Sequence, residues 1–281
     1  MKKASFLVML AAVMYAMGGI LFKIVQWNAF GIASLRAIIA GTILLVYCLM
    51  IKHKFKVNLS VILAAIGMTG TNLGFAVANK LTTAGNTIVL EFTMPVFVIL
   101  ILLIFYKKKP TKTELITSAL VLLGIILFFV DSLSAGNIWG DLIALAGGVA
   151  YAMYFVFTSR EDSDPLTSVV ISQLITATVG LPMLIQTPVF QSTPGELWAV
   201  AALGVTMAIA QISFSYGIKD TPPVTASLLS GIEPILNPLL VAIFWHEMLT
   251  PLALVGAAIV LGSIMVYNVI SAKQSQKEKA A

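Results

Sequence analysis

Apolar stretches of about 20 residues recur along the whole sequence, and each is long enough to cross a hydrocarbon core about 30 Å thick. Of the 281 residues, 59% are hydrophobic and 10% are charged, whereas soluble domains are about 45–50% apolar and 25% charged. In lipid, only helices and closed barrels satisfy every backbone hydrogen-bonding group, and these continuous runs lack the alternation of barrel strands. We therefore expect an all-α integral membrane protein embedded in a lipid bilayer.

The apolar stretches predict ten transmembrane helices. They lie at residues 5–25, 29–51, 59–78, 83–106, 114–131, 139–158, 166–186, 196–217, 222–245 and 250–271. With ten spans, 14 lysines and arginines fall on the side of the two termini and two on the other side, while Arg36 falls within a span. Because short basic loops stay in the cytoplasm, this pattern predicts a multi-pass protein of a prokaryotic plasma (inner) membrane with both termini cytoplasmic. The net charge of +5 follows from these loops and does not indicate nucleic-acid binding.

The two halves of the chain repeat each other. An offset of 139 residues pairs Lys80 with Lys219, Thr82 with Thr221, Leu90 with Leu229, Pro95 with Pro234, Phe105 with Phe244 and Thr111 with Thr250, and an offset of 136 pairs Tyr15-Ala16-Met17 with Tyr151-Ala152-Met153. Lys2 and Lys3 before an apolar run also resemble a signal peptide, but the repeat gives the first span a counterpart inside the chain. Because five spans is an odd number, the two copies must insert with opposite orientation. We expect inverted five-helix repeats at 1–131 and 139–271, followed by a cytoplasmic tail at 272–281.

Several short motifs resemble one known family. Ile232-Glu233-Pro234 precedes an apolar span, and His246-Glu247-Met248-Leu249-Thr250 precedes a last span containing Gly256 and Gly262. These features are similar to the repeat ending of the EamA-domain family of the drug/metabolite transporter superfamily. In the first half Met94-Pro95-Val96-Phe97 also fits, whereas Lys108 stands where the turn glutamate would be; Tyr15-Ala16 and Arg36 fit the first two helices. The resemblance implies a ten-helix carrier whose central cavity is formed mainly by spans one to four and six to nine.

Two glutamates lie near the middle of predicted spans. A charged side chain at the bilayer centre costs about 2.5–3.5 kcal/mol on insertion scales, so Glu91 and Glu233 are candidate functional residues. We expect each to lie on a polar helical stripe, with Thr83 and Thr87 beside Glu91, and with Thr225, Leu229 and Asn237 beside Glu233. Glu91 would bind a cationic group or a coupling proton; the alternative for either glutamate is a neutral, structural side chain that bonds neighbouring helices.

Other intramembrane polar residues are candidates for substrate binding. Asn72 and Asn79 are two helical turns apart, Gln211 and Ser215 are one turn apart, and Tyr15 and Tyr151 are equivalent in the two repeats. The amides also suit structural bridges between helices, and the tyrosine rings suit a cationic or aromatic substrate. Arg36 lies near the outer end of its span, so we expect it to snorkel to the interface as an anchor; anion binding or pairing with Glu91 is the alternative.

The remaining polar motifs have simpler explanations. Glu161, Asp162 and Asp164 predict a solvated loop, His246 with Glu247 predicts a cap for the turn between the last two spans, and Cys48 predicts packing. The sequence contains no phosphate-binding loop and no metal motif. We therefore expect no cofactor and no hydrolysis of nucleotides by this chain.

These features favour a secondary transporter, not an enzyme, that moves a small polar metabolite by alternating access. An amino acid, an amine or a drug-like compound would be the substrate, and either a coupled proton or exchange would drive its transport. Two midplane glutamates favour amines or zwitterions. An intramembrane enzyme acting on a lipid or prenyl group, or a channel, are the alternatives from other classes; saturable counterflow would distinguish a carrier from a channel.

Overall fold

The structure, a computed structural model, describes residues 3–18, 21, 24–82, 84–130, 137–187, 189, 192–245 and 250–280. Within these ranges every regular element is a helix and none is a strand. The helices are α1 (Lys3–Ala16), α3 (Ala29–Met50), α4 (Leu59–Leu81), α5 (Ala84–Glu91), α6 (Met94–Tyr106), α7 (Lys112–Phe129), α8 (Ile138–Thr158), α9 (Pro165–Ile185), α10 (Pro194–Gly217), η3 (Ile218–Asp220), α11 (Pro223–Ser230), α12 (Glu233–Trp245) and α13 (Pro251–Ala280).

Most of the helices are long and apolar enough to cross a membrane. In the described ranges seven segments meet this criterion: Ala29–Met50, Leu59–Ala78, Asn86–Tyr106, Lys112–Phe129, Ile138–Thr158, Pro165–Ile185 and Pro194–Asp220. Three shorter apolar helical segments are Lys3–Ala16, Pro223–Leu236 and Pro251–Tyr267. The all-helical prediction is confirmed.

Two predicted continuous spans, 83–106 and 222–245, are each broken into two helices. The first break separates α5 from α6, and the second separates α11 from α12. In each case a proline, Pro95 or Pro234, is the second residue of the following helix. Proline has no backbone N–H and disfavours helical backbone at the preceding residue. Each of these two predicted spans is therefore interrupted by a short non-helical stretch, and the responsible prolines are visible in the sequence.

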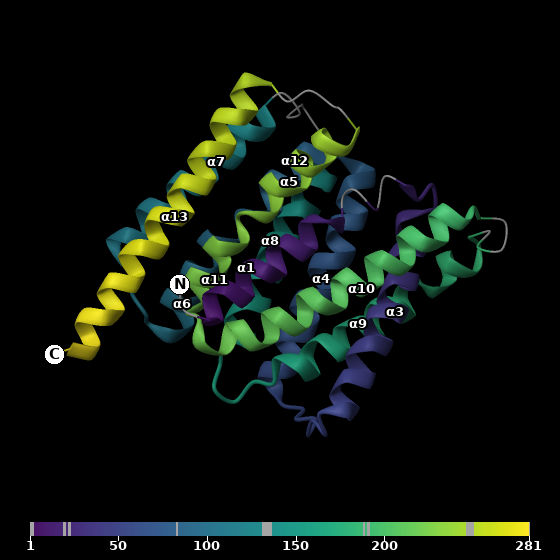
Figure 1. The fold of residues 1–281 in the computed structure, drawn as a ribbon, viewed down its shortest axis with the longest axis horizontal. Helices are drawn as coiled ribbons and strands as arrows, with labels where there is room; N and C mark the ends of the chain where they lie inside the picture. Colours follow the sequence, from purple (N-terminus) through teal and green to yellow (C-terminus); the bar gives the residue numbers. More distant parts are fainter. Residues whose placement is uncertain are drawn as a thin grey trace.

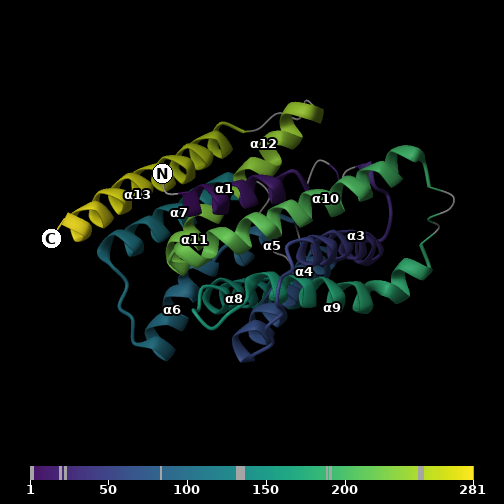
Figure 2. The same ribbon diagram turned by 60° about the horizontal axis from the view of Figure 1, so that its bottom comes forward.

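Helices from the two halves of the chain pack against each other in pairs. The principal pairs are α4 with α8, α1 with α10, α3 with α9, and α7 with α13. Figures 1 and 2 show α7 and α13 along one edge of the bundle, with α3, α9 and α10 toward the other edge and α8 and α1 between them. No principal pair joins two helices of the same half, so the described core is an interface between the halves.

Glycines allow a close approach between α4 and α8. A Cβ atom on Gly67 would lie 2.6 Å from the carbonyl oxygen of Ala150 and 2.8 Å from the backbone nitrogen of Tyr154. Gly74 lies two turns further along the same face of α4, where a Cβ would meet Gly147 Cα at 3.6 Å. Small residues at such positions let helix backbones approach closely in a membrane.

Polar residues cap the helix ends. Asn28, Asn58 and Asn137 accept hydrogen bonds from backbone N–H groups in the first turns of α3, α4 and α8. Thr111 with Glu114 and Thr193 with Glu196 form capping boxes at the starts of α7 and α10. Each such cap contributes about 1 kcal/mol, and together they fix where the apolar helices begin.

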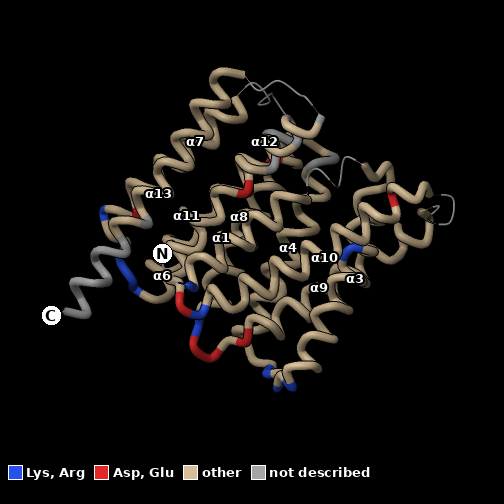
Figure 3. Tube along the Cα trace, viewed as in Figure 1, with Lys and Arg blue, Asp and Glu red and all other residues tan. Residues whose placement is uncertain are grey.

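Basic residues gather on one side of the bundle. Figure 3 shows most described lysines and arginines at helix ends along one side of the bundle. Contacts link these ends: Tyr47 near the end of α3 bonds Tyr216 near the end of α10 (O–O 3.0 Å), and α10 ends against the start of α1 at Ala4. We call this side, which carries loops 51–58, 107–111 and 159–164, the basic face, and the opposite side the far face.

Candidate functional site

A cavity of about 390 Å³ lies among helices from both halves. This volume is within the range of small-molecule sites, about 300–1,000 Å³. Its polar lining residues are Tyr15, Arg36, Thr71, Asn72, Glu91, Tyr151 and Glu233, and apolar residues supply most of the remaining wall. Because Gly18, Ala29 and Ala33 also line it, the cavity extends past the end of α1 and reaches the first residue of α3. It therefore reaches toward the far face.

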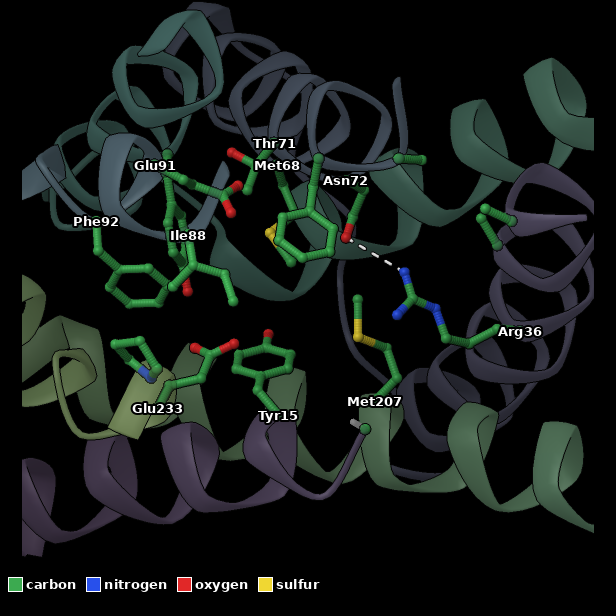
Figure 4. Close-up of a pocket in the computed structure, with 17 residues that line it drawn as sticks. Tyr15, Arg36, Met68, Thr71, Asn72, Ile88, Glu91, Phe92, Met207 and Glu233 are labelled. Atoms are coloured by element: carbon green, nitrogen blue, oxygen red, sulfur yellow. Dashed lines mark hydrogen bonds between the residues drawn. The ribbon is translucent and has the colours of Figure 1, made fainter. Parts of the chain in front are cut away.

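A guanidinium group and two carboxyl groups occupy opposite sides of the cavity. In Figure 4, Arg36 projects from one side, while Glu91 and Glu233 project from the other side above and below the space. Arg36 Nη2 donates to Asn72 Oδ1 at 3.4 Å. Glu233 points toward Tyr15, and Glu91 lies on the other side of the space from Glu233.

Several polar atoms around the cavity lack protein partners. Glu91 is only 5% exposed, and its Oε1 accepts no hydrogen bond from the described residues. The same is true of Glu233 Oε2, and neither the Tyr15 hydroxyl nor Asn72 Nδ2 has a partner within the described ranges. A buried polar group left unsatisfied costs about 1–3 kcal/mol. This arrangement is suited to a polar ligand or to water that completes the missing bonds.

The backbone breaks and glycines position the two glutamates. Glu91 ends α5 and Glu233 begins α12, so both lie at the interruptions caused by the prolines. Gly147 and Gly148 of α8 pack against Glu91: a Cβ on Gly147 would lie 3.7 Å from its Oε1, and one on Gly148 would lie 2.9 Å from its carbonyl oxygen. Helices broken near the midplane are typical of substrate sites in secondary transporters.

The two equivalent tyrosines both reach the cavity. Tyr15 comes from α1 and Tyr151 from α8. Tyr151 packs edge-on against Phe92, with ring centroids 6.3 Å apart. One aromatic ring from each half of the chain is thus part of the same lining, next to the Glu233 carboxyl group.

The sequence-based expectations for the side chains of Arg36 and Thr225 were wrong. Arg36 does not snorkel outward but points into the cavity, where Asn72 accepts its hydrogen bond. Thr225 does not continue a polar stripe with Glu233, because the two residues lie in separate helices and only Glu233 lines the cavity. Instead its hydroxyl bonds the Tyr267 hydroxyl of α13 (O–O 2.9 Å).

Two further candidates lie outside the cavity wall, and two cannot be placed because their side chains fall outside the described residues. Gln211 and Ser215 are fully buried in α10 and are not part of the cavity wall. The side chains of Asn79 and Asn237 fall outside the described residues, as does the expected cap at His246 and Glu247. Asn72 and Gln211, which are equivalent in the repeat, therefore occupy different surroundings.

The acidic loop is solvent-exposed at Glu161 and Asp162, as expected, whereas Asp164 is buried and bonded into the basic face. Asp164 is 4% exposed, accepts a 2.6 Å bond from Thr167 and lies 2.7 Å from His53 Nε2. Burial raises the pKa of Asp164, but the Thr167 and His53 contacts outweigh it and lower this pKa below its ordinary value. Hydrogen bonds from Arg160 and Ser60 likewise lower the pKa of Asp162.

This loop network joins the two halves of the chain. Asn58 donates to the Asp162 carbonyl oxygen, and Ser60 donates to its carboxylate at 2.8 Å, so the start of α4 is tied to the α8–α9 loop. Arg160 also bonds the Tyr106 hydroxyl at the end of α6 (2.9 Å). The basic face is therefore closed by polar contacts, whereas the cavity extends toward the far face.

Sequence reasoning missed several lining residues. They are Met68, Thr71, Phe75, Ile88, Phe92, Met207 and Pro234, with small residues between them. Met68, Asn72 and Phe75 recur at helical spacing along α4. The helix face that carries Asn72 could therefore have identified Met68 and Phe75 as lining residues. Phe92 lies in the break between α5 and α6, where a continuous helix would place it differently.

Comparisons with known proteins agree with this architecture. The threonine/homoserine exporter RhtA of Escherichia coli K12 is 26% identical over 258 residues, covering 88% of this chain and 84% of that protein. An uncharacterized transporter of Archaeoglobus fulgidus is 27% identical over 209 residues, covering 70% of this chain and 75% of that one. A solved crystal structure with 18% sequence identity covers 95% of this chain and 97% of its own with a TM-score of 0.83, and so shares the fold.

The EamA-like transporter family matches the chain twice, over residues 2–130 and 138–269. These two matches include every polar cavity residue. With its membrane-crossing helices and transporter relatives, the chain is an integral membrane protein and a membrane transporter. It belongs to the EamA-like transporter family.

Proposed function

We propose that this protein is a secondary carrier for a small zwitterionic amino acid. The observation that carries the proposal is the cavity with one guanidinium on one wall and two carboxyl groups on the other. An α-amino acid carries a carboxylate and an ammonium group of matching charges. Arg36 would bind the carboxylate, and Glu91 with Glu233 would bind the ammonium group. Coupling to a proton and exchange of one substrate for another are both compatible with this site.

The proposed architecture is ten transmembrane helices in two inverted repeats, at 1–131 and 139–271. Reciprocal packing supports it: α4 of the first half packs on α8 of the second, and their repeat equivalents α10 and α1 pack together in the same way. The breaks support it too, because Met94-Pro95 and Glu233-Pro234 are related by the 139-residue offset. Inverted repeats of this kind let the halves rock around a fixed midplane site, which is alternating access.

The proposed orientation places the basic face in the cytoplasm. The described lysines gather there (Figure 3), and short basic loops are retained on the cytoplasmic side. In this orientation both chain ends are cytoplasmic and the cavity extends outward. The membrane would be the prokaryotic plasma (inner) membrane, and segment 272–281 a cytoplasmic tail.

The relatives suggest which amino acids to test first. Because one relative is named as an exporter of threonine and homoserine, L-threonine and L-homoserine are the first candidates. Both are small enough for a cavity of about 390 Å³. The cavity's remaining polar atoms, including Thr71 and Asn72, would contact a side-chain hydroxyl.

Binding of substrate analogues to purified variants tests the charge assignment. A ligand that binds only the folded state raises the unfolding temperature. We expect L-threonine to stabilise the wild type, while analogues lacking the carboxyl group or the amino group bind more weakly by about tenfold or more, since each charged hydrogen bond contributes about 1.5–3 kcal/mol. Arg36→Gln should remove the advantage of the carboxyl group, and Glu91→Gln that of the amino group.

Thr206→Ala is the matched control, because the Thr206 hydroxyl bonds only carbonyl oxygens of its own helix among the described residues. It should bind all three ligands as the wild type does. If Arg36→Gln and Glu91→Gln also left the ranking of the analogues unchanged, the assignment of the two charged walls would be wrong.

A further inference from the structure

A line of polar side chains continues from the cavity toward the basic face. Met207 of α10 lines the cavity, and Gln211 and Ser215 follow at intervals of four residues on the same face of the helix. On α8, Tyr151 lines the cavity and Tyr154 follows almost one turn deeper. Since α10 ends at the basic face, Gln211 and Ser215 lie between the cavity and that face.

These side chains are buried without partners. Gln211 is 0% exposed, Tyr154 1% and Ser215 2%. Both amide atoms of Gln211 and both hydroxyls lack hydrogen bonds to the described part of the chain. The Tyr15 hydroxyl lies close to the Gln211 and Tyr154 side chains. These unsatisfied groups thus form one set that begins at the end of the cavity nearest the basic face.

Buried hydroxyls outside this line are often satisfied. Ser34 donates to the Ala177 carbonyl oxygen at 2.8 Å, Ser227 to that of Val224 at 2.9 Å, and Thr158 to that of Tyr154. A serine or threonine in a helix usually has such an acceptor within its own preceding turn. Ser215 makes no such bond, so its hydroxyl is left for another partner.

An aromatic layer covers the line in this conformation. Tyr154 of α8 stacks on Phe214 of α10 with centroids 5.0 Å apart and planes 24° apart, and Phe155 packs edge-on against Phe214 at 5.1 Å. Both helices belong to the second half of the chain, and α1 of the first half packs against α10. A rocking motion of the halves would therefore move α1 away from α10 and uncover this layer.

We infer that Tyr154, Gln211 and Ser215 line the inner half of the translocation path, closed here by the packing of α1 against α10 beside the Tyr154–Phe214 stack. When the halves move apart, water and the polar groups of an amino acid supply the missing hydrogen bonds. Ser215 is then exposed to the solution at the basic face, and Gln211 contacts the passing substrate. This inference rests on the proposed alternating access but names residues that do not line the present cavity.

Cysteine labelling tests the path, because the chain has a single native cysteine, Cys48. In a Cys48→Ala background, Ser215→Cys is nearly isosteric and breaks no hydrogen bond of the described chain. The matched control is Ser118→Cys in α7, which replaces another buried serine whose hydroxyl has no described partner. Each variant is treated with a membrane-impermeant maleimide in inside-out and right-side-out vesicles, with and without L-threonine.

We expect the maleimide to label Ser215→Cys from the basic face at least about tenfold faster than Ser118→Cys, even if the inward-open state is a minor population of about 1–10%. L-Threonine should change that rate. Labelling no faster than the control, or only from the far face, would overturn the inference. Gln211→Cys gives the same comparison if Ser215→Cys fails to fold. Counterflow of L-threonine by the Cys48→Ala protein separates the two proposals. If this protein transports L-threonine while both introduced cysteines stay unlabelled, only the inferred inner path is wrong. If it does not transport L-threonine, the proposed function fails.

Discussion

Replacing Gly67 by alanine should force α4 and α8 apart. The added Cβ would lie 2.6 Å from the Ala150 oxygen and 2.8 Å from the Tyr154 nitrogen, whereas apolar contacts are optimal at about 3.5–4.0 Å. Both obstacles are backbone atoms, so α8 must move by roughly 0.5–1 Å. Overpacking costs about 1–3 kcal/mol, and the better helix propensity of alanine offsets about 1 kcal/mol. At the upper end of that overpacking cost, the net destabilisation is thus about 1–2 kcal/mol.

The effect should appear in thermal unfolding of the purified protein in detergent, followed by tryptophan fluorescence. At about 2–4 °C per kcal/mol, Gly67→Ala should lower the midpoint by roughly 2–8 °C. Because α8 carries Tyr151, transport should also fall. Gly74→Ala is the control on the same helix face: its Cβ would meet nothing closer than 3.6 Å, so its midpoint should stay level or rise. Equal midpoints for the two variants would refute the close packing of α4 on α8.

Glu91→Gln should change the rate and flatten the pH profile of proteoliposome uptake; an unchanged rate and profile would remove Glu91 from the mechanism. Asp164→Ala should lower stability by about 1–2 kcal/mol because the cap of α9 is lost, whereas Asp164→Asn should keep the cap and lose only the charge facing His53. The pKa of Asp164 in the folded protein is below its ordinary value of about 4. Its contribution to stability should therefore be present above about pH 4 and disappear as the pH falls through the lowered pKa. Acid unfolding can measure this loss. Thr225→Val and Tyr267→Phe should each cost about 1 kcal/mol in unfolding assays without changing the KM of transport; a raised KM would place Thr225 in the site after all.

Hydropathy was sufficient to predict the helical fold, because a bilayer admits few alternatives for such apolar runs. It was not sufficient to predict the breaks in the fourth and ninth regions. Pro95 and Pro234 mark both positions, yet a proline in a membrane helix can also be accommodated as a kink. Only the packing of the surrounding helices decides between a kink and a break.

The sequence likewise predicted some of the cavity residues and not the packing around them. Burial cost identified Glu91 and Glu233, and the repeat identified Tyr15 and Tyr151; all four line one cavity. Arg36 was expected to snorkel because sequence gives its depth in the span but not the face of α3 that meets Asn72. The tie between His53 and Asp164 joins residues 111 positions apart, and no local pattern predicts such a pairing.

Counterflow in proteoliposomes tests the carrier assignment most directly. Vesicles containing the protein are loaded with unlabelled L-threonine or L-homoserine and diluted into a trace of the labelled amino acid. A carrier with one site that faces each side in turn predicts transient accumulation of label above equilibrium, with an initial rate that saturates with concentration and is lost in Arg36→Gln. Label that only equilibrates, at a rate linear in concentration and unchanged in Arg36→Gln, would contradict transport through this cavity by alternating access.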